Sequence, residues 1–213
     1  MGYITFYLYV ANVVLGDWLA TIVAIVSWII AAWVCIHPTF RKVLIKPDVI
    51  IPLALIFGTS LFYNSIALSC RTDEFSRSCY TSQMPLDNDI SQTFAQNVRA
   101  DHPKERIGDW QGSDRPPLQT GVILSHGLFT ADKSIGTANS QLLSSLLQCF
   151  WVVAIWALGR AIGLSKQRAL LVILLCLFSG FFFFNSVLVW PKLLAASYVL
   201  LTFSLLFFEK PSR

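Results

Sequence analysis

Long apolar runs alternate with short charged connectors along most of this sequence. One apolar region covers residues 3–36, a second covers 49–68 and a third covers 142–158. A fourth, residues 169–208, contains Lys192 as its one charged residue. Because a helix crosses about 30 Å of hydrocarbon with about 20 apolar residues, these runs predict an all-α integral membrane protein.

Breaks inside the first apolar region predict where its spanning helix begins. Gly16-Asp17 interrupts the apolar pattern, so the first span fits Trp18–Ile36, with Asp17 at its mouth on the outer interface. Tyr3–Leu15 is short for a crossing and rich in aromatic residues. We interpret it as an interfacial segment or as the start of a tilted helix.

The remaining runs bring the expected total to about five transmembrane helices. The second span starts at about Val49 and places Pro52 in its first turn, where a missing backbone donor costs little. The fourth run is long enough for two helices, so it must fold back on itself. Polar, aromatic and helix-ending residues mark that turn at 185–192.

Residues 70–140 are polar, carry both acidic and basic side chains, and contain no run long enough to cross. The chain therefore divides into three parts. An N-terminal part with two spans (1–69) is followed by a large extracytoplasmic loop with short helices (70–140). The third part has three spans and a short cytoplasmic tail (141–213).

Two short elements and one rigid stretch are expected inside the loop. The helical spacing of Ile90, Phe94 and Val98 predicts a helix over Asp89–Ala100. Leu118–Phe129 is apolar but short, which indicates a re-entrant or surface-lying piece with an interfacial helix. Before it, Pro116-Pro117 cannot sit inside a helix and holds Asp114-Arg115 in extended geometry.

The positions of Lys and Arg predict the orientation. The connectors 37–48 and 159–168 and the C-terminal tail hold eight basic residues, whereas the 185–192 turn holds Lys192 alone. With five spans, the three basic segments fall on one side, which the positive-inside rule makes cytoplasmic. The loop 70–140 and the 185–192 turn then share the outer face, periplasmic or luminal, and we expect a multi-pass membrane protein.

Composition agrees with this prediction and excludes one class of partner. The chain is 55% hydrophobic and 13% charged, with a mean hydropathy of +0.61, whereas soluble domains carry about 25% charged residues. The net charge is +4, but no basic stripe is interleaved with exposed aromatic residues, so nucleic acid is not an expected partner.

The cysteines and histidines give one expected link and no metal site. Cys70 and Cys79 bracket a short loop on the outer face, where oxidation is permitted, and a disulfide is favoured over two free thiols. The three histidines show no metal-ligand spacing to one another or to the cysteines. A divalent metal is compatible with the chemistry considered below, but nothing in the sequence requires one.

The order of motifs on the outer side resembles the N-terminal part of bacterial GT-C-type polytopic glycosyltransferases. Examples of that family are the lipid A aminoarabinose transferases and the protein O-mannosyltransferases, and the likeness is closest to uncharacterised members. The motifs that carry it are Leu86-Asp87-Asn88-Asp89, Gly108-Asp109-Trp110, Asp114-Arg115-Pro116-Pro117-Leu118, Asn185-Ser186 and Trp190-Pro191-Lys192-Leu193-Leu194.

The resemblance implies a multi-pass protein of the bacterial inner membrane whose long loop is periplasmic or extracellular. It also implies transfer of a sugar from a polyprenyl-phosphate donor to an acceptor at the outer face. It assigns Asp87 or Asp89 as base or metal-assisting carboxylate, which fits the need to deprotonate the acceptor. Phosphate contacts would come from Arg115 as a bidentate donor and from Lys192 as a point charge. The other implied substrate-binding residues are Asp109, Asp114 and Trp190.

Plainer interpretations of the same residues stay open. Asp87 and Asp89 also fit turn and N-cap positions, and Asp114-Arg115 also fits a solvated ion pair on a rigid loop. Lys192 also fits a side chain that snorkels to the headgroups beside Trp190.

The family has more spans than this chain and a C-terminal extramembrane domain, so a truncated or split enzyme is one expectation. The alternative is a non-catalytic polytopic membrane protein that acts as an assembly or interaction partner. Both expectations involve membrane lipid, and a second membrane subunit is compatible with either. A transporter fits less well, because the spans hold almost no ionisable residues and show no internal repeat.

Overall fold

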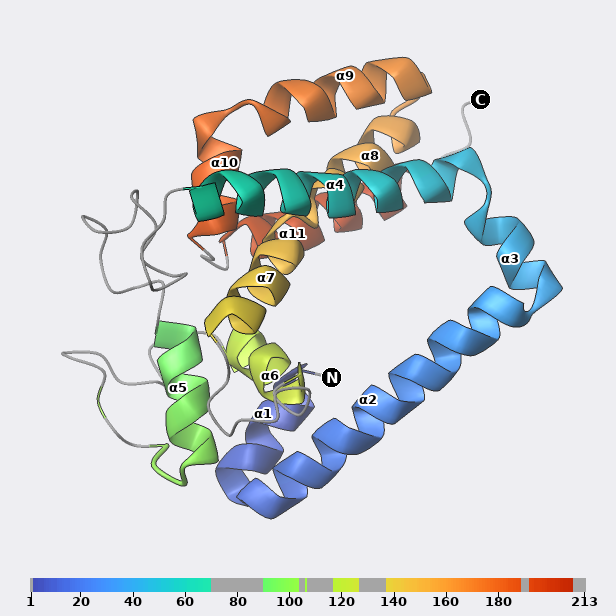
Figure 1. The fold of residues 1–213 in the computed structure, drawn as a ribbon. Helices are drawn as coiled ribbons and strands as arrows, with labels where there is room; N and C mark the ends of the chain where they lie inside the picture. The colour runs from blue at the N-terminus through green and yellow to red at the C-terminus, as the bar shows by residue number, and fades with distance from the viewer. Residues whose placement is uncertain are drawn as a thin grey trace. The chain divides into compact units, whose positions relative to one another are not determined.

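The computed structural model describes residues 2–69, 90–103, 106, 117–126, 137–188 and 192–208, and all regular structure within them is α-helical. The helices are α1 (Gly2–Ala11), α2 (Val13–Ile36), α3 (Pro38–Leu44), α4 (Pro47–Ser69), α5 (Ile90–Arg99), α6 (Pro117–His126), α7 (Thr137–Gln148), α8 (Trp151–Ala161), α9 (Lys166–Leu177), α10 (Gly180–Val187) and α11 (Lys192–Phe208) (Figure 1). The all-helical class predicted from the apolar runs is thus confirmed for these residues.

Three helical segments are long and apolar enough to cross a membrane: Val13–Ile36, Pro47–Ile66 and Leu142–Ala161. A fourth crossing is available if α9 and α10, which meet at a bend of 69°, act as one broken span. The last helix, α11, is apolar but has 17 residues, or about 25 Å at 1.5 Å per residue. A multi-pass membrane protein follows from these lengths, and the fifth span remains a prediction.

The helices form two compact units, each with its own core. The first unit comprises residues 1–43 and 83–140, and the second comprises 44–82 and 141–213. In the first unit α1, α5 and α6 gather around the start of α2 (Figure 1). Its buried core consists of Phe6, Tyr9, Ala20, Phe94, Ala95, Val98, Ile123 and Leu124.

Helix α5 confirms the prediction from apolar spacing. Ile90, Phe94 and Val98 are all buried on one face of this helix, as a 3.6-residue period requires. The helix ends at Arg99, and Asp101 follows with φ of 62°, the left-handed conformation that is common just past a helix C-terminus.

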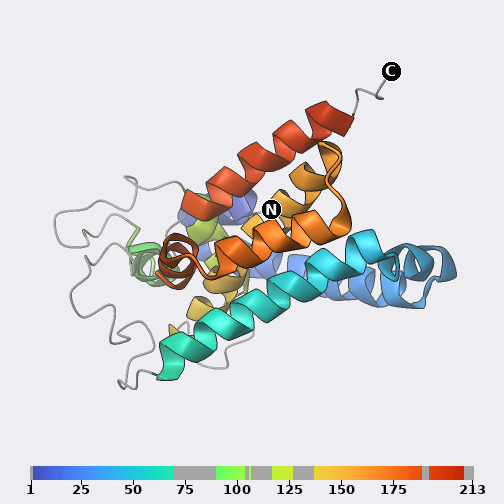
Figure 2. The ribbon, with the colours of Figure 1, turned by 90° about the horizontal axis from the view of Figure 1, so that it is seen from above.

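In the second unit α8 packs against α4, α9 and α11. The axes of α4, α9 and α11 are broadly aligned in both views, and α11 runs in the direction opposite to α4 and α9 (Figures 1 and 2). The core of this unit combines Trp151, Trp156 and Ile173 in one cluster with Tyr63 and Cys149 in another. Tyr63 also joins two helices, because its hydroxyl donates a hydrogen bond of 2.7 Å to the carbonyl of Leu177.

Three helix starts differ from the sequence-based expectation. Helix α6 begins at Pro117, which was expected outside any helix, because the first helical position tolerates a proline. The first spanning helix begins at Val13 instead of Trp18, because the Asn12 side chain caps it by accepting a hydrogen bond from the Leu15 amide at 3.1 Å. Asp17 therefore lies in the second turn and not at the mouth of the helix. The second span begins with Pro47, so Pro52 is inside the helix and not in its first turn.

The last apolar run breaks twice. The predicted turn in 185–192 is confirmed, since α10 ends at Val187 and α11 begins at Lys192. A second break between Leu177 and Gly180 was not expected. The Ser179-Gly180 pair at this break is a common site of sharp bends.

Candidate functional site

Most residues singled out from the sequence lie outside the part that the structure describes. These are Cys70, Cys79, Asp87, Asp89, Asp109, Asp114, Arg115 and Trp190. Their roles, and the disulfide, therefore stay predictions. Lys192 is described: it is the first residue of α11 and its side chain is exposed.

Next to the N-terminal end of α11, the second unit buries a group of uncharged polar side chains from α4 and α7. We call Ser60, Asn64, Ser145 and Gln148 the amide cluster. Asn64 is 2% exposed, and Ser145 and Gln148 are each 0% exposed. Buried polar side chains within candidate spans are expensive unless they are bonded, and they often mark function.

Hydrogen bonds within the cluster join three helices. The Asn64 amide nitrogen donates to the Ser60 carbonyl at 2.7 Å and to Ser145 Oγ at 3.0 Å. Gln148 lies one turn beyond Ser145 on α7, and its Oε1 accepts a hydrogen bond of 3.1 Å from the Leu194 amide of α11. The cluster thus caps one of the free amides at the start of α11.

Each of the two amides keeps one group without a hydrogen bond. Among the described residues, no donor reaches Asn64 Oδ1 and no acceptor reaches Gln148 Nε2. The amide cluster therefore contains one unbonded acceptor and one unbonded donor, the two kinds of group with which a hydroxyl can pair. Leaving a buried polar group unbonded costs about 1–3 kcal/mol, so fold stability alone does not explain why both groups are present.

Lys192 places a positive charge at the N-terminal end of α11, the end at which the amide cluster holds a backbone amide. It lies two residues before Leu194, the residue whose amide is held by Gln148. The start of a helix also favours anions, because its free amides and the helix dipole present partial positive charge. The combination of uncharged amides and one cation suits a ligand with hydroxyl groups next to an anionic group.

Sequence reasoning missed Asn64 and Gln148 because it searched the spans for ionisable residues. The available signal was an amide side chain inside an otherwise apolar run, at position 64 in the second span and at 148 in the third. Such residues are infrequent in hydrocarbon for the same energetic reason as charges, although the cost is smaller.

In the first unit, Asp17 has a structural role. The Tyr9 hydroxyl donates to Asp17 Oδ1 at 2.5 Å, and Arg99 Nη2 lies 3.7 Å from the same oxygen. This network ties α1 and α5 to the second turn of α2.

Among the residues that the structure describes, no three His, Cys, Asp or Glu side chains lie close enough together to bind a metal ion. Comparison with protein-family models, with curated proteins and with solved structures finds no match to this chain.

Proposed function

We propose that this chain is a multi-pass membrane protein that binds a polyprenyl-phosphate-linked sugar and transfers the sugar to an acceptor. The observation that supports this function best is the amide cluster beside Lys192. Asn64 Oδ1 and Gln148 Nε2 suit a sugar hydroxyl. Lys192 suits the phosphate that links the sugar to its lipid.

The catalytic part of the proposal rests on the sequence resemblance. Transfer needs a carboxylate to deprotonate the acceptor hydroxyl, and Asp87 or Asp89 is the candidate. As the bond from the sugar to the phosphate breaks, negative charge builds on the leaving phosphate. A cation that strengthens its contact at that moment lowers the barrier, and Arg115 or Lys192 is the candidate for that contact.

The test uses the full chain in proteoliposomes with a radiolabelled polyprenyl-phosphate sugar, and it measures binding and transfer separately. Asp87→Asn combined with Asp89→Asn is expected to abolish transfer while binding remains. Lys192→Gln is expected to weaken binding, because the contact to phosphate is lost. Ser65→Leu, next to Asn64 but exposed and bonded only within its own helix, serves as the control and should change neither.

Two outcomes would overturn the proposal. Full transfer by the triple variant Asp87→Ala, Asp89→Ala and Arg115→Ala would exclude the assigned chemistry. Failure of the wild-type chain to bind the lipid-linked sugar would exclude the ligand. Binding without transfer would overturn the catalytic part and favour the non-catalytic partner.

A further inference from the structure

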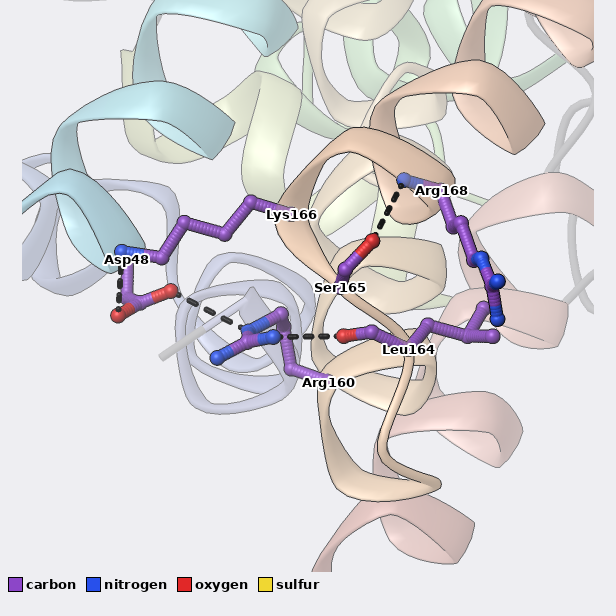
Figure 3. A network of polar contacts seen from close by, with 6 residues as sticks. All are labelled: Asp48, Arg160, Leu164, Ser165, Lys166 and Arg168. Carbon is purple, nitrogen blue, oxygen red and sulfur yellow. Dashed lines mark hydrogen bonds and ion pairs between the residues drawn. The ribbon is translucent and has the colours of Figure 1, made fainter.

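The far end of the second unit carries a second polar group, which the proposed function does not use. Asp48 at the start of α4 pairs with two cations, Arg160 at the end of α8 and Lys166 at the start of α9 (Figure 3). Arg160 Nε lies 3.3 Å from Asp48 Oδ1, and Lys166 Nζ lies 3.2 Å from Asp48 Oδ2. Two cations share one carboxylate, so this group carries a net positive charge.

Arg160 is held in place and is still accessible. Its Nη1 donates a hydrogen bond of 2.6 Å to the Leu164 carbonyl in the turn between α8 and α9 (Figure 3). With Asp48 on one side and Leu164 on the other, the guanidinium is fixed. Its side chain is nonetheless 32% exposed and that of Lys166 is 42% exposed, so both can contact an anion from solution or from a lipid.

An apolar pocket of about 550 Å³ opens beside this ion-pair group. Asp48 and Arg160 form its polar border. The rest of its wall comes from α4, α8 and the end of α11, chiefly Pro52, Leu53, Val153, Trp156, Ala157 and Phe208. A volume between about 300 and 1,000 Å³ is typical of sites for small molecules.

We propose that this pocket binds an anionic phospholipid, with the phosphate at Arg160 and Lys166 and one acyl chain among the apolar side chains. Charge decides between lipid classes. A phosphate diester with a neutral headgroup complements the net positive charge, and the guanidinium and the ammonium group can each donate a charge-assisted hydrogen bond to it. A zwitterionic lipid brings an ammonium group, which the two cations repel.

The predicted orientation agrees with this ligand. The pocket lies at the basic end of the unit, which the positive-inside rule places on the cytoplasmic side. Basic pockets between membrane helices on that side recognise anionic headgroups. Phe208 and Lys192 are at opposite ends of α11, about 24 Å apart at 1.5 Å per residue, so this site is separate from the amide cluster.

The test is native mass spectrometry and thermal unfolding of the full chain, released from nanodiscs of phosphatidylglycerol or of phosphatidylcholine. The wild-type chain should retain phosphatidylglycerol in preference to phosphatidylcholine. Arg160→Gln should weaken that retention about tenfold or more, the loss expected for a charge-assisted hydrogen bond. Arg168→Gln removes the same charge from an exposed position of α9 outside the pocket wall and should change retention less than about twofold.

A second variant keeps the proposal testable if Arg160→Gln fails to fold. Ala157→Phe fills the apolar part of the pocket and leaves the ion pairs unchanged, and it should also abolish selective retention. Equal retention of both lipids by the wild-type chain would overturn the proposal. So would an Arg160→Gln effect no larger than that of Arg168→Gln. Stabilisation by inorganic phosphate without retained lipid would show a free-anion site and would equally overturn it.

Discussion

Replacing Asn64 by Leu tests whether the amide cluster serves a ligand or the stability of the fold. Asn64 is buried between α4 and α7, and its amide nitrogen bonds to Ser145 Oγ at 3.0 Å. Its carbonyl oxygen has no hydrogen-bond donor among the described residues. Leu has the same branching and the same number of side-chain heavy atoms as Asn and is somewhat larger, so the change removes the polar group while keeping the interior filled.

The structure gives the sign and the size of the stability change. Removing the unbonded Asn64 oxygen recovers about 1–3 kcal/mol. The lost hydrogen bond to Ser145 Oγ costs about 0.5–1.5 kcal/mol. The side chain also loses its 2.7 Å bond to the Ser60 carbonyl, which costs little because that carbonyl keeps its backbone bond within α4. The free energy of unfolding should therefore rise by about 1 kcal/mol, and Tm by about 2–4 °C for a chain of this size.

Ligand binding should change in the opposite direction. If Asn64 accepts a hydrogen bond from a sugar hydroxyl, Asn64→Leu should weaken binding of the lipid-linked sugar about tenfold. Tm is measured by far-UV circular dichroism in nanodiscs, and binding by the proteoliposome assay. Ser65→Leu introduces the same side chain at the neighbouring exposed position of α4 and should alter neither quantity.

Two results would refute the reasoning. A fall in Tm of several degrees would show that Asn64 stabilises the fold, and the unbonded oxygen would lose its significance. A rise in Tm with unchanged binding would show that the cluster is not where the ligand binds. A variant that is both more stable and weaker in binding is the expected signature of a binding residue.

Three further predictions concern the two units and the loop. Gly121→Ala should destabilise the chain, since an added Cβ would lie 1.9 Å from a backbone oxygen of α1. Gly58→Ala meets nothing within 4 Å and should stabilise the chain by about 1 kcal/mol. Equal Tm shifts for the two variants would contradict this prediction. Burial, aided by a hydrogen bond to a carboxylate, raises the pKa of Tyr9 above 10.0. The tyrosine should therefore stabilise the fold below pH 10 and lose this effect as pH rises further, and Tyr9→Phe should flatten the pH dependence of Tm above about pH 10. Because a disulfide between Cys70 and Cys79 is expected, alkylation of the denatured, unreduced chain should modify three of its five cysteines. Modification of all five would contradict the disulfide.

Apolar spacing predicted the features that depend on neighbours in sequence. The buried face of α5 and the turn before Lys192 follow from local periodicity and local helix-ending residues. The start of α2 was predicted wrongly although its signal is local. Asn12 is a good N-cap, but the glycine at position 16 was interpreted as the break before the helix, so the helix was predicted to begin too late. That glycine is inside the helix, where it lets the Tyr9 ring approach closely.

The candidate site depends on contacts that no local pattern contains. Asn64 meets Ser145 across 81 residues, and Gln148 meets Leu194 across 46. The ion pairs of Asp48 with Arg160 and Lys166 likewise join segments far apart in the chain. The basic connectors could be assigned to one side of the membrane by counting charges. That Asp48 joins the connector 37–48 to the connector 159–168 could be identified only in the folded unit.

The most direct test of the account is labelling with a membrane-impermeant maleimide in intact cells. The variants are Lys192→Cys, Asp114→Cys and Lys166→Cys, each in a background without the five native cysteines. Positions 192 and 114 should be labelled from outside the cell, whereas position 166 should react only after the cells are permeabilised. Labelling of 192 only from the cytosol, with 114 labelled only from outside, would contradict this prediction.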